Sequence, residues 1–289
     1  KAANKKAEWA NFSATKPSAE YAKWMKLLGL VKQKYVAAPS KMLQMVNQFT
    51  RPSDTIKPAD WDFNPNKIHL VGVRRHEAKP GERVFDDVFI LLIQGMTFKF
   101  YGSTEPGATD NPKGAPFLAQ GQHHFRFAWH KLSDHNRVYH ALKPLNHGVL
   151  SVRSRDFMLT DADLATGLEC NNSINIHWGG EGMGVIGAWS EGCQVMVGKG
   201  YLNHNEKPIN CSSYAAPNYA KLGKVENGIY QTKGAYTMLG DLVAALSGAE
   251  RDDNVLRYML LYEADLALNP EIGAAKAAGI LQQLQTLPA

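Results

Sequence analysis

Cysteine is scarce in this chain, and its few thiols follow no structural pattern. The 289 residues include only three cysteines, Cys170, Cys193 and Cys211, at unrelated spacings. Disulfide-stapled domains and paired-cysteine zinc sites both depend on regular, repeated spacings. The sequence therefore argues against a disulfide framework and against a CxxC-type zinc site, and at least one thiol is left over if two should pair.

Long apolar runs and dense clusters of one charge are missing too. The longest apolar run, VFILLIQGM from Val88, has the length of a strand, whereas a membrane helix needs about eighteen apolar residues. The formal charge is +5, but most lysines and arginines are scattered, and a nucleic-acid-binding stripe would be denser. We therefore expect no transmembrane segment and no nucleic-acid partner. The sequence carries no signal for an oligomeric state.

The pattern of apolar residues predicts an α+β fold. Residues 17–49 have helical spacing with a break at Pro39-Ser40, which predicts two helices. From Trp61 onward, short alternating runs separated by Gly, Pro and Asn predict strands. AYTMLGDLVAALSG then predicts a helix, NVLRYMLLYE a strand and NPEIGAAKAAGILQQLQTL a closing helix. We expect a mainly β core, mixed or antiparallel, flanked by N- and C-terminal helices. The units are a helical extension over 1–60, a core domain over 61–265 and a C-terminal helix over 266–289 packed on that domain.

One stretch, INIHWGGEGMGVIGAWSEGCQVMVG over residues 174–198, places an imidazole and a thiol around a glycine-rich segment. INIHW reads as a strand that ends at His177, and CQVMVG as a strand that begins at Cys193, so both side chains should lie at the same edge of the core. Only the thiolate is a strong nucleophile, and a thiol with a pKa of about 8.5 needs a neighbouring base. We therefore interpret Cys193 as a nucleophile and His177 as its general base. The alternative is a small buried hydrophobe and an ordinary core histidine.

Glycines and aromatic residues surround this pair. Gly192 allows a turn whose N–H groups point at an oxyanion, and Gly179 and Gly180 would let a substrate backbone approach closely. Three aromatic residues are candidates for the walls of the site, with core packing as the alternative for each; they are Trp178, Trp189 and Tyr101.

Other polar clusters give weaker signals. Five histidines suggest a metal site, but their spacings suit alternating strands, and no carboxylate or cysteine lies at ligand spacing; they are His123, His124, His130, His135 and His140. We therefore expect no metal ion. Arg153, Arg155 and Asp156 form either a surface ion-pair group or a clamp for a substrate carboxylate.

The segments IHWGG and WSEGCQV resemble the catalytic signature of the L,D-transpeptidase (YkuD) family, in which a histidine and a spacer precede Ser or Thr, His, Gly and Cys. FYGSTEPGATDNPKGAPFLAQGQHHF, SVRSRD and LRYMLLYE look like the flanking strands of a variant subgroup in phage-associated and uncharacterised bacterial proteins. The resemblance spans about residues 67–262. It identifies residues 61–265 as a YkuD-like catalytic domain.

The resemblance implies a cysteine enzyme that acts on peptidoglycan stem peptides without a cofactor. Cys193 would attack the carbonyl of the third stem residue, commonly diaminopimelate, and expel the terminal D-amino acid as a thioester forms. An amine acceptor would then give a cross-link or an exchanged terminus. Water would instead give an L,D-carboxypeptidase or endopeptidase, such as a lysin or toxin. The expected location is the periplasm or cell envelope, or outside the cell.

The resemblance also assigns supporting roles. Gly192 and Cys193 would supply oxyanion N–H groups, and Ser190 or a nearby backbone carbonyl would orient the imidazole. The residues expected to bind substrate are Trp178, Gly179, Trp189, Gln194 and Tyr101.

Three features depart from the family pattern: Glu191 stands where the family usually has histidine, Gln194 follows the cysteine, and the twelve-residue spacer between His177 and Ser190 is short. Glu191 would disfavour a neighbouring thiolate unless its carboxylate points away or partners His177. These departures concern the choice of acceptor. They keep open a non-catalytic wall-binding module, and the histidine-rich strands keep open a zinc-dependent hydrolase.

Overall fold

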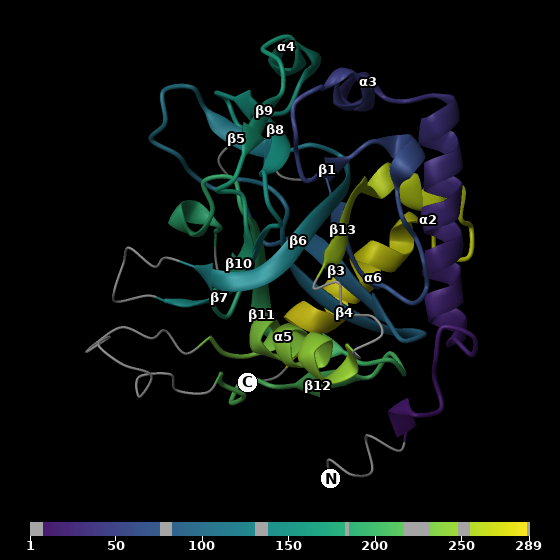
Figure 1. The fold of residues 1–289 in the computed structure, drawn as a ribbon. Coiled ribbons are helices and arrows are strands. Elements are labelled where there is room, and N and C mark those ends of the chain that lie inside the picture. The colour runs from purple at the N-terminus through teal and green to yellow at the C-terminus, as the bar shows by residue number, and fades with distance from the viewer. Residues whose placement is uncertain are drawn as a thin grey trace.

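The computed structural model describes residues 8–75, 83–130, 138–182, 185–216, 232–247 and 255–287. Figure 1 shows their helices and strands, which follow in chain order. They are α2 (Ala19–Ala37), α3 (Lys41–Gln48), β1 (Thr55–Ile56), η1 (Pro58–Asp60), β2 (Ile68–Arg74), β3 (Asp87–Ile93), β4 (Met96–Ser103), β5 (Ala115–Leu118), β6 (Gly121–His130), β7 (Tyr139–Pro144), β8 (Val149–Ser154), α4 (Asp161–Leu164), β9 (Glu169–Asn171), β10 (Ile176–Trp178), η2 (Gly187–Trp189), β11 (Gln194–Leu202), β12 (Pro208–Asn210), α5 (Ala235–Leu246), β13 (Leu256–Tyr262), η5 (Glu263–Leu268) and α6 (Gly273–Gln285).

The main sheet closes on itself. Its strands run in the order β6-β13-β2-β3-β4-β11-β10-β7, and β7 pairs again with β6, so eight strands of the described chain form a continuous ring. Within the ring, β13 pairs in parallel with β2, and β10 pairs in parallel with β11. All other adjacent strands of the ring are antiparallel. The fold is therefore α+β with a mainly β, mixed core, as the sequence predicts.

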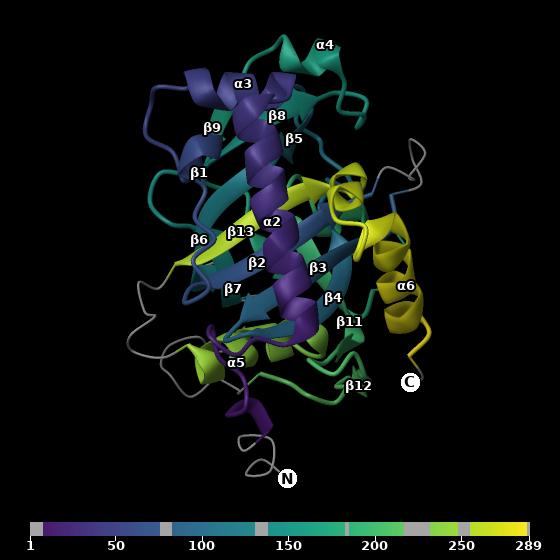
Figure 2. The same ribbon diagram turned by 90° about the vertical axis from the view of Figure 1, so that its right-hand side faces the viewer.

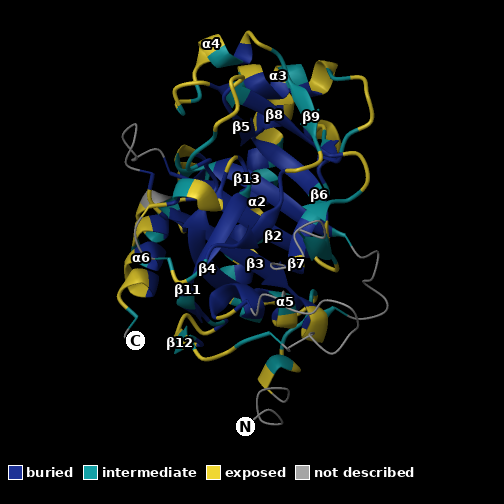
Figure 3. Ribbon diagram, turned by 90° about the vertical axis from the view of Figure 1, so that its left-hand side faces the viewer, coloured by how far each residue is buried: buried dark blue, intermediate teal, exposed yellow. Residues whose placement is uncertain are grey.

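The ring is apolar on both faces. In β3, Phe89 and Leu91 face an inner cluster that also holds Leu239 from α5, because successive side chains of a strand point to opposite faces. Their neighbours Val88 and Ile90 join an outer cluster with residues of α2, α3 and α6. Every residue of β2, β3 and β4 is accordingly buried, and Figure 3 shows this core in dark blue.

Helices cover the outside of the ring and one of its ends. Figure 2 shows α2 lying across the outer face of the sheet, with α6 beside it, while α5 lies beneath the strands. Ser18 and Ser40 cap α2 and α3 by accepting hydrogen bonds from the amides of Tyr21 and Leu43. Trp24 is fully buried, and burying such a side chain contributes about 1.5 to 3 kcal/mol or more. The two N-terminal helices thus share one core with the sheet.

A second sheet of three strands, in the order β5-β8-β9, stands beside the ring (Figure 1). It lies next to the end of the ring at which β10 and β11 begin, and both sheets contribute residues to one cavity. Among the described residues, each helix is too short or too polar to cross a bilayer.

Candidate active site

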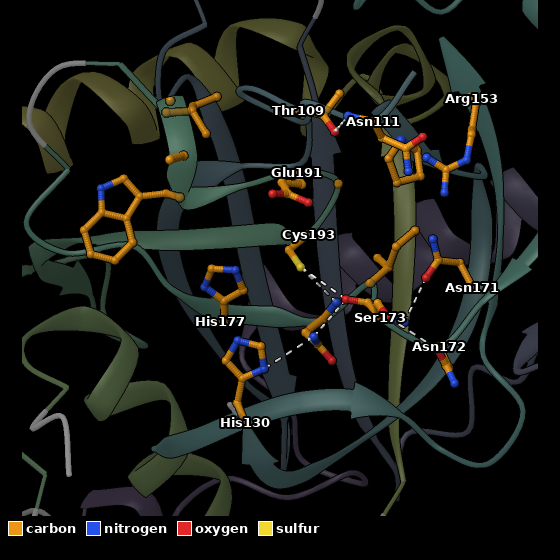
Figure 4. A pocket seen from close by; sticks show the side chains of 18 of the residues that line it. Thr109, Asn111, His130, Arg153, Asn171, Asn172, Ser173, His177, Glu191 and Cys193 are labelled. Atoms are coloured by element: carbon orange, nitrogen blue, oxygen red, sulfur yellow. Dashed lines mark hydrogen bonds between the residues drawn. The ribbon is translucent and has the colours of Figure 1, made fainter. Parts of the chain in front are cut away.

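The cavity between the two sheets has a volume of about 950 Å³. The large ring contributes β10 and the residues directly before β11, and the small sheet contributes β8 and β9. Cys193 and His177 both line this cavity, and Figure 4 shows their side chains directed into the same space. The structure thus brings together the two side chains that the sequence singles out.

Strand register explains why these two residues line the same cavity. β10 and β11 lie parallel and adjacent, with Ile176 opposite Gln194 and His177 opposite Val195. Cys193 therefore stands beside Asn175, and the side chains of Asn175 and His177 share one face because they are two residues apart on a strand. The backbone N–H of Asn175 donates to the Cys193 Sγ at 3.4 Å. The thiol in turn donates to the Ser173 carbonyl at the same distance. An N–H donor to sulfur stabilises the thiolate form.

The His177 ring is held in one tautomer. Its Nδ1 lies 2.8 Å from the carbonyl oxygen of Trp178. Because a carbonyl only accepts, Nδ1 carries the proton, and Nε2 is the basic nitrogen of the neutral ring. The sequence offers two groups that could orient the imidazole, Ser190 and a nearby backbone carbonyl. The Trp178 carbonyl orients it in the structure, and the Ser190 hydroxyl instead donates to the carbonyl of Cys193.

Ser190 organises the turn that presents the nucleophile. Its Oγ donates to the carbonyl of Cys193 at 2.7 Å and accepts from the amide of Gly192 at 3.1 Å. The Gly192 N–H is thus bound within the turn and is not directed at an oxyanion. Gly192 is required here for space, because an added Cβ would lie 2.5 Å from a side-chain carbon of Pro116 in β5.

Two aromatic rings pack on His177, the candidate base. Neither is among the site residues assigned from sequence. His130, at the end of β6, stacks on His177 with centroids 5.3 Å apart and planes at 16°. Tyr139 of β7 meets His130 and His177 edge-on, at 5.2 and 6.4 Å. Burial and the nearby Cys193 thiolate raise the pKa of Tyr139, which stays a neutral hydroxyl. Asn175 ties His130 to the nucleophile, since its Nδ2 lies 3.5 Å from the His130 Nδ1.

The small sheet supplies a polar wall. Arg153 in β8 binds Glu169 in β9 through two nitrogens, Nε at 3.0 Å and Nη2 at 2.9 Å, and its Nη1 donates to the carbonyl of Gly114. The guanidinium therefore already holds a carboxylate from the same chain. Asn111, Asn171 and Asn172 continue this wall (Figure 4). Arg155 and Asp156 are not among the lining residues.

The two candidate tryptophans form the apolar wall. Trp178 is buried and Trp189 is 43% exposed, and their rings pack edge-to-face with centroids 5.9 Å apart. Both line the cavity. Gly179 and Gly180 lie outside the lining. A Cβ on Gly179 would clash with Val195, and Gly180 has a φ of +80° and packs under the Trp189 ring.

Gln194 and Tyr101 lie away from the cavity. Gln194 follows Cys193 directly, so its side chain points to the opposite face of β11, where Oε1 accepts a hydrogen bond from Tyr258 inside the ring. Tyr101 is buried in β4 against Gly182 and Gly198, and burial raises its pKa. The structure therefore gives neither side chain access to a ligand in this cavity.

The remaining histidines are parts of the sheet. His123 is buried between Thr55 and the carbonyl of Ala119, and burial lowers its pKa to about 3. His140 packs at a tilt against Trp129, with ring centroids 4.0 Å apart and planes at 47°. His135 lies outside the described residues. Within the described part of the chain, no three His, Cys, Asp or Glu side chains are placed to share a metal ion.

Comparison with known proteins gives no match at a significant level, whether with protein-family models, curated proteins or solved structures. The geometry of the cavity and the sequence motif around Cys193 are therefore the features that bear on function.

Proposed function

We propose that this chain is a cysteine-dependent acyl-transfer enzyme of the L,D-transpeptidase type, acting on peptidoglycan stem peptides. The observation that carries the proposal is the presence of the Cys193 thiol and the His177 imidazole in one cavity, with the ring held in a single tautomer by the Trp178 carbonyl. A thiol and a positioned base in one site are the minimum apparatus for nucleophilic catalysis at a carbonyl.

The first half-reaction transfers the acyl group to sulfur. His177 Nε2 takes the thiol proton, and Sγ attacks the carbonyl carbon of the third stem residue. The C–N bond then breaks, and the leaving D-amino acid takes the proton from His177 to depart as a neutral amine. The Asn175 amide that donates to Sγ supports the thiolate before attack. The motif implies two oxyanion donors, the backbone N–H groups of Gly192 and Cys193. The Cys193 N–H is the donor in this mechanism, because the Gly192 N–H donates to Ser190.

The second half-reaction decides the product. An amine that attacks the thioester forms an amide and returns the sulfur to a thiol, which gives cross-linking or exchange. Water gives a carboxylic acid and hence a carboxypeptidase or endopeptidase. The cavity of about 950 Å³ is large enough for an extended peptide and an acceptor. With this substrate, the proposed location is the periplasm, the cell envelope or the outside of the cell.

The test is incubation of the protein, and of its Cys193→Ala variant, with tetrapeptide-bearing muropeptides, followed by mass spectrometry of the products. Dimers that depend on Cys193 indicate transpeptidation, and loss of one residue without dimers indicates a carboxypeptidase. An unchanged set of muropeptides across several stem types, with both proteins, would overturn the proposal in favour of a wall-binding module.

A further inference from the structure

We propose that Glu191 makes the acceptor side of this site selective for a positively charged group, so that the thioester reacts preferentially with ammonium-bearing nucleophiles. The inference rests on the proposed acyl transfer. It assigns a role to the residue at which this chain departs from the family signature.

Glu191 lies at the mouth of the cavity beside the nucleophile. It stands two residues before Cys193, in the turn held by Ser190, and its side chain is exposed while lining the cavity. In the view of Figure 4, the thiol lies between the Glu191 carboxylate and the His177 ring. Among the described residues, no lysine, arginine or histidine forms an ion pair with this carboxylate.

The other carboxylate of the cavity is neutralised. Glu169 is held by two nitrogens of Arg153, so their charges cancel. Glu191 is thus the one carboxylate among the described lining residues without an ion pair. An exposed carboxylate at the entrance to a cavity attracts cations and repels anions, and salt weakens both effects.

The attack of an ammonium-bearing acceptor requires the removal of two protons. Glu191 holds the ammonium and takes the first proton, which leaves a neutral amine whose lone pair attacks the thioester carbonyl. The C–S bond breaks, and its electron pair goes to the sulfur. His177 takes the second proton from the nitrogen and passes it to the sulfur, which restores the thiol. Glu191 then returns its proton to solvent.

The first experiment measures the electrostatic potential at the Cys193 thiol and needs no peptide substrate. Cationic trimethylammonium-ethyl and anionic sulfonatoethyl methanethiosulfonates are reacted with the wild type, Glu191→Gln and Glu191→Asp, and modification of Cys193 is followed by peptide mapping. We expect Glu191→Gln to lower the ratio of cationic to anionic rates by about threefold or more, because the variant no longer attracts the cationic reagent or repels the anionic one. Glu191→Asp should keep most of the ratio, and high salt should reduce the ratio in the wild type and in Glu191→Asp much more than in Glu191→Gln. An equal ratio in the wild type and Glu191→Gln overturns the inference.

The second experiment measures the acceptor itself. Thioester formed from a tetrapeptide muropeptide is partitioned between D-alaninamide, which is largely cationic at neutral pH, and neutral hydroxylamine. We expect Glu191→Gln to shift the product ratio towards the hydroxylamine product by a similar factor. An unchanged ratio would overturn the acceptor preference even if the reagent ratio changes. Failure to form any Cys193-dependent thioester would instead overturn the proposed function, and the acceptor preference with it.

Discussion

Cys193 and Cys170 line the same cavity, but their surroundings differ in the groups that decide reactivity. Cys193 directly precedes β11, and its thiol donates to the Ser173 carbonyl at 3.4 Å. In addition, the backbone N–H of Asn175 donates to its sulfur, and His177 faces the same space. Cys170 stands in β9, where its thiol donates to the His147 carbonyl at 3.1 Å, and burial together with the Asp54 carboxylate raises its pKa. Both thiols are half-buried, so exposure does not distinguish them. Their neighbours do.

The largest expected effect is on activity. Cys193→Ala should abolish turnover of stem peptides, a fall on the order of a thousandfold or more, because no other group in the cavity replaces the nucleophile. Cys170→Ser removes the other thiol of the cavity and should cost less than about tenfold. Product formation followed by mass spectrometry checks both variants. Equal losses in the two would remove the distinction between the thiols.

The pH dependence of labelling sharpens the same contrast. Burial raises the pKa of Cys211 to about 11, so at pH 8 only about one molecule in a thousand carries its thiolate, and labelling should rise as the pH approaches 11. Cys170, whose pKa is also raised, should label mainly above the usual range for a thiol. Cys193 should therefore react first with iodoacetamide at neutral pH, by a factor of about a hundred over Cys211. Peptide mapping at several pH values measures this order.

Removal of the base should make Cys193 resemble Cys170. In His177→Ala the thiol ionises without an adjacent imidazole, and we expect its alkylation at pH 7 to fall by about ten- to a hundredfold. The loss should shrink as the pH rises above about 8.5, where an ordinary thiol ionises by itself. A rate at pH 7 equal to that of the wild type would show that His177 does not activate Cys193.

Gly192→Ala tests the turn that presents Cys193. The added methyl group would lie 2.5 Å from Pro116, so either β5 or the nucleophile must move. We expect a loss of about 1 to 3 kcal/mol in unfolding free energy, as in other overpacked sites, and about a tenfold fall in activity. Urea denaturation and product assays measure the two losses. Gly279→Ala in α6 is the control, because φ is not positive there and nothing lies within 4 Å of the added Cβ.

The smallest expected effect concerns the stacked ring. His130→Phe keeps an aromatic face against His177 but loses the contact with Asn175, whereas His130→Ala loses both. We expect a few-fold decrease in the alkylation rate of Cys193 for the Phe variant and about tenfold for the Ala variant, in keeping with about 0.5 to 1.5 kcal/mol for an aromatic pair. Equal rates in the two variants would leave the stack without a role.

Features that depend on neighbouring residues in the chain can be predicted from this sequence, whereas features that depend on distant segments cannot. The helices of residues 17–49, the β-rich core and the placement of His177 and Cys193 in one cavity depend on local periodicity and on two neighbouring strands, so local sequence patterns predict them. The closure of the sheet and the approach of His130 depend on pairing between distant strands, which local patterns do not contain. Gln194 is different, because the two-residue period of a strand already directs it away from the face that bears Cys193.

The most direct test of the central claim is intact-protein mass spectrometry of a reaction between the chain and tetrapeptide muropeptides, quenched early with acid. We expect a covalent adduct with the mass of the muropeptide less its terminal D-amino acid, mapped to Cys193 and absent from Cys193→Ala. Release of product by Cys193→Ala at the wild-type rate, or an adduct on Cys170 instead, would contradict it.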